Sequence, residues 1–225
     1  MKKLRFFIAL DLKSNTQNIN IVRKLYRHVY GFKVGYRSFY NNRSKELISE
    51  IKKSKCKLFL DLKLHDIPNQ VKKTVSAIAS LKSIKYLTVH TSGNYEMLKA
   101  AQEAAGSIEL LGVTVLTSQS NLEGVGVKNS IENQIKLLVN LAIKAGISGV
   151  IASAQDVSLV RSLSKELKIF CPGIRSGEDK QDQKRVMSYA DFSKIADDKC
   201  SAVIGRPIIE GDPVQNIKKI IQSAQ

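Results

Sequence analysis

The sequence predicts an α/β protein in which residues 1–225 fold as one (β/α)8 barrel domain. Apolar, β-branched runs alternate with amphipathic stretches such as 69–79, whose apolar residues recur every three or four positions. The apolar runs are nearly continuous, which is typical of parallel strands covered by helices. A chain of 225 residues can bury a full core, and no linker, repeat or low-complexity segment divides it.

Eight of these runs are candidate strands. They cover residues 5–11, 31–35, 57–63, 86–91, 110–116, 149–153, 168–172 and 202–205. Eight β–α units with right-handed crossovers close most simply into a barrel. A doubly wound open sheet is the alternative, because the number of strands does not decide whether a sheet closes.

The first three strands carry charge at or near their carboxyl ends. Run 5–11 follows a basic start but meets Asp11 too early to be the apolar core of a signal peptide, so we interpret it as a strand. Run 31–35 is apolar apart from Lys33, and run 57–63 leads into a charged segment. The ends of later strands carry polar or turn-forming residues: His90, Ser153, Pro172-Gly173-Ile174-Arg175 and Gly205-Arg206-Pro207.

The segment Asp61-Leu62-Lys63-Leu64-His65-Asp66-Ile67-Pro68 is the most informative part of the chain. Side chains two apart on a strand share a face, so Asp61 and Lys63 point one way and Leu62 and Leu64 the other. Asp66 follows the strand end, just before a helical pattern. Such charges are costly to desolvate unless they pair, and their placement at a strand end favours a role in chemistry.

In a barrel, the carboxyl ends of the strands converge on one mouth. We therefore expect an alternating network, Lys33–Asp61–Lys63–Asp66, that keeps both lysines protonated and both aspartates ionised. Asp11 ends the first strand, where it could either join this network or cap the following helix, and the sequence leaves both open.

An anion site is predicted on the opposite strands. Gly205 lets backbone N–H groups approach an oxyanion, and Arg206 offers paired donors to a phosphate, with Arg175 at the neighbouring strand end. Loops after strands seven and eight commonly bind phosphate in barrel enzymes. The polar stretch 175–185 is interpreted as a mobile lid over this face.

Composition excludes several classes of protein. No apolar run approaches the roughly 20 residues that span a bilayer, and three cysteines without metal-ligand spacing suggest a reducing cytoplasm. The formal charge of +16 fits anionic partners, yet the basic residues are scattered and Trp is absent, so we expect solvated faces and no nucleic-acid partner. No phosphate-binding or dinucleotide fingerprint is present, and the histidines form no metal cluster, so neither a cofactor nor a metal is expected.

These motifs together resemble the bacterial orotidine 5′-phosphate decarboxylase family. The matching segments follow the family's order along the whole chain: Ala9-Leu10-Asp11, Phe32-Lys33-Val34-Gly35, residues 61–69, Val89-His90, Leu116-Thr117-Ser118, Pro172-Gly173-Ile174-Arg175, Asp182-Gln183 and Gly205-Arg206-Pro207. The resemblance implies a cytoplasmic homodimer that converts orotidine 5′-monophosphate to UMP and CO2 in pyrimidine biosynthesis, without a cofactor.

The resemblance also implies a role for each residue. Lys63 would protonate C6 of the pyrimidine, Asp61 would lie beside the substrate carboxylate, and Asp66 would cross the subunit interface into the partner's site. Lys33 and Asp11 would hold the ribose hydroxyls. The remaining substrate contacts would come from Thr117 near the pyrimidine, Gln183, Gly205 and Arg206 at the phosphate, Arg175 beside the lid, and Ile67 and Gln70, the last standing where the family usually has Thr.

Two alternatives stay open. A Mg²⁺-dependent 3-keto-gulonate-phosphate decarboxylase or hexulose-phosphate synthase also resembles this chain around Asp61, Lys63 and Asp66, but its metal site needs an acidic residue where this chain has Lys33. A basic nucleic-acid-binding protein on a barrel scaffold would instead show clustered basic and aromatic residues.

Overall fold

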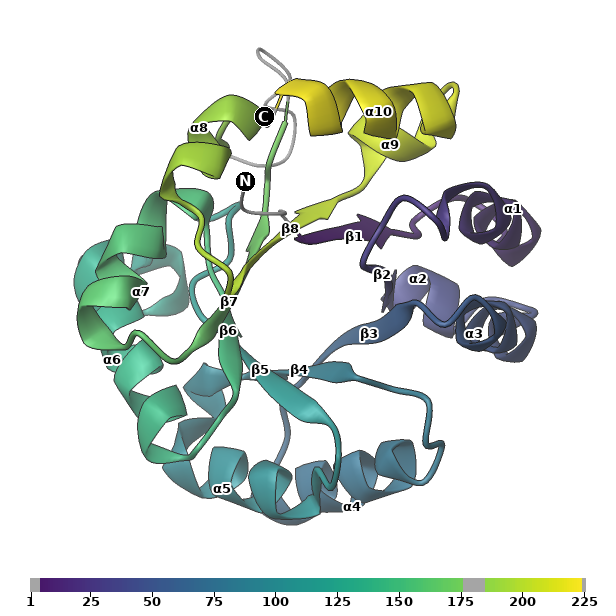
Figure 1. Cartoon of the computed structure of the whole chain (residues 1–225). Coiled ribbons are helices and arrows are strands. Elements are labelled where there is room, and N and C mark those ends of the chain that lie inside the picture. The colour runs from purple at the N-terminus through teal and green to yellow at the C-terminus, as the bar shows by residue number, and fades with distance from the viewer. Residues whose placement is uncertain (1–4, 176–184, 224–225) are drawn as a thin grey trace.

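The structure is a computed structural model that describes residues 5–175 and 185–223. Its eight strands are parallel and pair in chain order, and β1 (Arg5–Ala9) also pairs with β8 (Cys200–Ile204), so the sheet is a closed barrel. Figure 1 shows β1 beside β8 and the helices arranged around the outside of the strands. The predicted (β/α)8 barrel is therefore confirmed, and the open sheet is excluded.

The other strands are β2 (Gly31–Gly35), β3 (Lys57–Leu64), β4 (Tyr86–His90), β5 (Glu109–Val113), β6 (Gly149–Ile151) and β7 (Lys168–Pro172). The helices are α1 (Asn15–Leu25), α2 (Tyr36–Phe39), α3 (Ser44–Lys53), α4 (Pro68–Ala79), α5 (Asn94–Ala104), α6 (Ile131–Lys144), α7 (Val157–Leu163), α8 (Tyr189–Ile195), α9 (Arg206–Ile209) and α10 (Pro213–Ser223), with short 3-10 turns η1 (Thr91–Gly93), η2 (Glu123–Val125) and η3 (Ala154–Asp156).

Several strands end earlier than the apolar runs suggested. The first ends at Ala9 and not at Asp11, and the fifth ends at Val113 and not at residue 116. The apolar pattern continues past these ends because residues such as Leu10 and Val115 are buried beneath the loops of the mouth. The apolar pattern of the sequence indicates which residues are buried, and the buried residues extend beyond the last residue that pairs with a neighbouring strand.

The core has two layers. The larger one fills the space between the strands and the surrounding helices, and includes outward-facing strand residues such as Leu60 and Leu62. The smaller one closes the inside of the barrel with aromatic rings, among which the Tyr86 and Phe170 centroids lie 4.9 Å apart. Because alternate residues share a face, Asp61 and Thr88 lie inside the barrel one step beyond Phe59 and Tyr86. The aromatic layer is therefore the floor of the polar mouth.

The ends of the predicted lid are anchored, while residues 176–184 of that segment lie outside the described residues. The Arg175 N–H donates to the carbonyl of Met187 at 3.0 Å, which continues a short bridge between Ile174 and Met187. The Arg185 guanidinium pairs with Asp156 at 2.7 Å.

In the described part of the chain, no helix is both long and apolar enough to cross a bilayer.

Candidate active site

Four charged side chains from the first three strands form a chain of ion pairs at the mouth. Lys63 Nζ lies 2.7 Å from Asp61 Oδ1, and Lys33 Nζ lies 3.2 Å from Asp61 Oδ2. Lys33 Nζ also lies 3.8 Å from Asp11 Oδ2. The order is therefore Asp11–Lys33–Asp61–Lys63, in which each interior ion has an opposite charge on both sides.

This arrangement decides the role of Asp11. Ser14 caps helix α1, because its hydroxyl accepts the Gln17 N–H and the Gln17 side chain accepts the Ser14 N–H. Asp11 is not needed as the helix cap and pairs with Lys33 instead. Of the two interpretations that the sequence left open, the structure supports membership of the charged network.

Asp61 is buried, with only 8% of its surface exposed. Burial alone would raise the pKa of its carboxyl, but the charges and hydrogen bonds of Lys33 and Lys63 outweigh burial and lower the pKa to about 2. Burial acts against the charge of Lys33 as well, yet Asp61 and Asp11 raise the pKa of Lys33 above its ordinary value. At neutral pH, Asp61 is therefore an anion and Lys33 a cation.

An irregularity in β3 sets the position of Lys63. Leu60 pairs with Leu87 and Leu64 pairs with Val89, so β3 has three residues where β4 has one, Thr88. Lys63 adopts a positive φ of 41°, which is unfavourable for a side chain other than glycine. Within this bulge the Asp61 and Lys63 side chains pair, while Leu62 stays buried outside the barrel.

Two neighbouring side chains hold this bulge. The Tyr36 hydroxyl donates to the Leu62 carbonyl at 2.5 Å, and the Lys63 N–H donates to Thr88 Oγ1 at 2.8 Å. Thr88 was missed by sequence reasoning, although alternation along β4 places it on the inward face with Tyr86 and His90. That alternation is the signal that could have found it.

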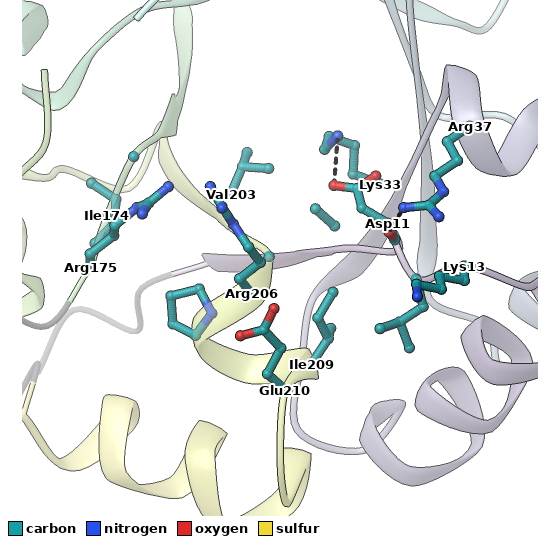
Figure 2. Close-up of a pocket in the computed structure, with 15 residues that line it drawn as sticks. Asp11, Lys13, Lys33, Arg37, Ile174, Arg175, Val203, Arg206, Ile209 and Glu210 are labelled. Carbon is teal, nitrogen blue, oxygen red and sulfur yellow. Dashed lines mark hydrogen bonds and ion pairs between the residues drawn. The ribbon is translucent and has the colours of Figure 1, made fainter. Parts of the chain in front are cut away.

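A cavity of about 500 Å³ adjoins the charged network. Figure 2 shows Asp11 and Lys33 on one side of it and Arg175 and Arg206 on the other. Gly205 also lines it, where an added Cβ would lie 3.5 Å from the Ala9 Cβ. The volume is that of a small-molecule site, and the three guanidinium groups that line it, those of Arg37, Arg175 and Arg206, suit an anionic ligand. The predicted anion site and the charged network thus meet in one cavity.

Asp66 does not join the network as predicted. Although Lys63 and Asp66 are both among the described residues, they form no ion pair within this chain. Asp66 is exposed beyond the end of β3, where its Oδ1 accepts the Ile67 N–H at 2.7 Å. The reason is geometric: the chain turns outward into α4 after Leu64, so Asp66 leaves the face that Asp61 and Lys63 share.

Ile67 and Gln70 lie near Asp66 at the start of α4, and both are exposed, Ile67 at 63%. Thr117 follows β5, is partly buried, and accepts the Arg185 N–H through its carbonyl at 3.4 Å. Gln183 lies outside the described residues. None of the three residues Ile67, Gln70 and Thr117 lines the 500 Å³ cavity.

The histidine that ends β4 lies beside the network. His90 is partly buried, and its ring centroid is 5.4 Å from that of His65. Burial, together with the charges of His65 and Lys63, lowers the pKa of His90. A neutral imidazole next to the lysine fits this environment. Across residues 5–175 and 185–223, no three His, Cys, Asp or Glu side chains are grouped so that they could hold a metal ion.

The barrel, its buried carboxylate between two ammonium groups, and the cationic cavity define a class of protein: a (β/α)8-barrel enzyme for a small anionic substrate. Comparisons with known proteins narrow this class. The model of the orotidine 5′-phosphate decarboxylase / HUMPS family matches residues 4–220. The chain belongs to this family.

Its relatives match over nearly their whole length. The chain is 38% identical to orotidine 5′-phosphate decarboxylase of Methylacidiphilum infernorum, covering 97% of this chain and 96% of that one. It is 40% identical to the same enzyme of Ehrlichia chaffeensis, covering 96% and 94%. The crystal structure of orotidine 5′-phosphate decarboxylase from Lactobacillus acidophilus superposes with a TM-score of 0.83 at 30% identity, covering 99% of this chain and 100% of that one.

Proposed function

We propose that this protein removes CO2 from orotidine 5′-monophosphate and releases UMP, without a metal or an organic cofactor. The observation that carries the proposal is the Lys33–Asp61–Lys63 arrangement, with both distances at or below 3.2 Å, beside a cavity that contains Arg175 and Arg206. The names of the relatives support the same substrate. Because UMP is a pyrimidine nucleotide, the reaction belongs to pyrimidine biosynthesis.

The reaction needs stabilisation of one carbanion. The bond between C6 and the carboxylate breaks, CO2 leaves, and the electron pair stays on C6, where the pyrimidine ring offers no adjacent electron sink. A fixed ammonium close to C6 stabilises this charge electrostatically. Lys63 then donates a proton from Nζ to C6 and recovers one from solvent, so atoms and charge balance.

Asp61 contributes in two ways. Its carboxylate fixes Lys63 Nζ at 2.7 Å, which orients the proton donor before the substrate arrives. It also repels the substrate carboxylate: two like charges ~4 Å apart at an effective dielectric of about 20 repel by on the order of 4 kcal/mol. Loss of CO2 relieves this repulsion, because the departing group is neutral.

Groups far from C6 supply the binding energy. Asp11 and Lys33 would bind the ribose hydroxyls, and Gly205 and Arg206 would bind the phosphate from the opposite side of the cavity. Thr117 would lie near the pyrimidine, Gln183 would add a phosphate contact, and Arg175 would border the predicted lid. These contacts hold the substrate carboxylate against Asp61 and so connect binding to the chemical step.

We propose a homodimer as the working form. Asp66, Ile67 and Gln70 share an exposed surface at the start of α4, and there Asp66 makes no contact with Lys63 of its own chain. A second subunit would bring its own Asp66 to this chain's Lys63 and complete the alternation of charges, with Ile67 and Gln70 contacting the partner's substrate.

The cytoplasmic location predicted from the cysteine content stays a prediction; all three cysteines are free.

The family description also covers HUMPS proteins, so the Mg²⁺-dependent sugar-phosphate reaction is the second candidate. Lys33 argues against it, because the metal site of that reaction needs an acidic residue at this position, whereas here the Lys33 Nζ lies between Asp61 and Asp11. An ammonium there repels a cation and already neutralises both carboxylates.

One assay separates the two candidates. Orotidine 5′-monophosphate absorbance is followed in buffer treated with EDTA, and UMP formation is verified by chromatography. We expect full activity after chelation. Loss of orotidine 5′-monophosphate that EDTA abolishes and Mg²⁺ restores would contradict the cofactor-free mechanism. No loss of orotidine 5′-monophosphate under either condition, together with Mg²⁺-dependent consumption of 3-keto-gulonate phosphate, would reject the proposed function and favour the sugar-phosphate reaction.

A further inference from the structure

The backbone of β3 leaves its ladder at the residue that carries the proton donor. Between the pairs Leu60–Leu87 and Leu64–Val89, three residues of β3 lie opposite Thr88. A bulge of this kind removes backbone groups from strand pairing, and a buried N–H without a partner is unfavourable. The Lys63 N–H finds its partner in the Thr88 hydroxyl, at 2.8 Å.

The same hydroxyl makes a second contact. Thr88 Oγ1 donates to Asp61 Oδ1 at 3.1 Å, the carboxylate oxygen that also receives Lys63 Nζ at 2.7 Å. A threonine hydroxyl has one hydrogen to give and lone pairs to accept, so both bonds form together. One oxygen atom thus joins the main chain of Lys63 to the carboxylate that holds the side chain of Lys63.

Burial makes this hydroxyl hard to replace. Thr88 is 0% exposed and Asp61 is 8% exposed. Lys63 also has the unfavourable φ of 41°, a conformation that persists only when its surroundings hold it. Without the hydroxyl, the Lys63 N–H would have to seek another partner, and its backbone would be free to leave the positive-φ conformation.

We propose that Thr88 is a positioning residue, whose hydroxyl fixes the Asp61 carboxylate and the Lys63 backbone in the arrangement needed for proton delivery. This inference rests on the proposed function. Thr88 is not among the residues that line the cavity, and its two hydrogen bonds go to Lys63 and Asp61 and not to the predicted phosphate and ribose groups. Its loss should therefore reduce kcat while leaving KM for orotidine 5′-monophosphate nearly unchanged.

Three variants test this. Thr88→Val keeps the shape and removes the hydroxyl, Thr88→Ser keeps the hydroxyl and removes the methyl group, and Thr91→Val is the matched control. Thr91 is equally buried and donates to the Val113 carbonyl at 2.6 Å, without touching the charged network. We expect kcat to fall by about 10- to 100-fold in Thr88→Val, the size of effect that a small misplacement of reacting groups produces.

The other two variants should retain kcat within about threefold of the wild type, because each leaves both Thr88 hydrogen bonds in place. Near-normal kcat in Thr88→Val would overturn the proposal. An equal loss in Thr88→Ser would also overturn it, since packing and not the hydroxyl would then be responsible. A rise in KM with unchanged kcat would assign Thr88 to binding and reject the positioning role.

A second measurement does not depend on activity or on folding of the valine variant. Amide hydrogen exchange of Lys63 in the wild type and in Thr88→Ser should be slow, because its N–H is bonded inside the barrel. Exchange of this amide at the rate of an exposed loop would overturn the proposal. If the wild type exchanges slowly but does not decarboxylate orotidine 5′-monophosphate, the proposed function fails while the hydrogen bond stands.

Discussion

Lys63 Nζ lies 2.7 Å from Oδ1 of Asp61, two residues earlier on the same strand. Residues two apart on a strand share a face and lie about 7 Å apart, a distance that a lysine side chain can span. Here the bulge opposite Thr88 and the positive φ of Lys63 fix the approach. The backbone conformation of β3 therefore sets the geometry of the Asp61–Lys63 ion pair.

Replacement of Lys63 by alanine should abolish UMP formation while leaving the barrel folded. Removing a positioned proton donor typically costs about 10²- to 10⁴-fold in rate, and the loss of the ammonium beside the carbanion adds to this. The measurement is single-turnover conversion of orotidine 5′-monophosphate, with circular dichroism to verify folding. Lys57→Ala, an exposed lysine at the other end of β3, is the matched control and should be fully active.

Turnover by Lys63→Ala within about tenfold of the wild type would reject the assigned role.

Asp61 should make stability depend on pH in the acid range. Its pKa is lowered from the ordinary 3.8 to about 2 in the folded protein. A carboxyl of this kind stabilises the fold above pH ~4, and the contribution, about 2 kcal/mol, is lost as pH falls through the folded pKa. The free energy of unfolding, measured with urea from about pH 6 to pH 2, should fall more steeply in the wild type than in Asp61→Asn.

Parallel curves for the two proteins would show that Asp61 is not held as an anion. The variant should also lose activity, because Lys33 and Lys63 would no longer share a counter-ion.

Arg206 should determine how strongly the protein prefers a phosphorylated ligand. A charge-assisted hydrogen bond to phosphate contributes about 1.5–3 kcal/mol, so Arg206→Gln should weaken UMP binding by about 10- to 100-fold. Binding of uridine, which lacks the phosphate, should not change, and calorimetry with both ligands measures the difference. Arg27→Gln, at an exposed arginine in the turn before β2, is the control.

An equal loss of UMP and uridine affinity in Arg206→Gln would place the arginine elsewhere in the site.

A shared active site predicts complementation between two inactive variants. If Asp66 acts in the partner's site, then a mixed dimer of Lys63→Ala and Asp66→Ala contains one intact site and one that lacks both groups. Random exchange of subunits in an equal mixture should therefore restore about a quarter of wild-type activity. Sedimentation of the separate and mixed variants verifies that each is dimeric.

Mixing without any recovery, although subunits exchange, would mean that Asp66 does not cross the interface.

Much of the site could be predicted because strand periodicity is local. Lys33, Asp61 and Lys63 were placed at one mouth from their positions in apolar runs, and their pairing was confirmed. Within one chain Lys63 and Asp66 do not pair, because alternation ends where the strand ends and the chain turns into α4, and pairing across a dimer stays a prediction. Arg175 and Arg206 were predicted to share a site, and both line the cavity, since neighbouring strands bring their ends together.

By itself, the sequence determined the alternation of strands and helices and the identity of the charged residues, because apolar periodicity and residue type are properties of neighbouring positions along the chain, whereas closure of the sheet was seen only in the structure. Only the tertiary structure decided that Asp11 pairs with Lys33 while Ser14 caps α1, and that Thr88 binds both Asp61 and the Lys63 backbone. These contacts join different strands, and their geometry depends on the register and the bulge between β3 and β4. Register is set by how the whole barrel closes, which no single segment specifies.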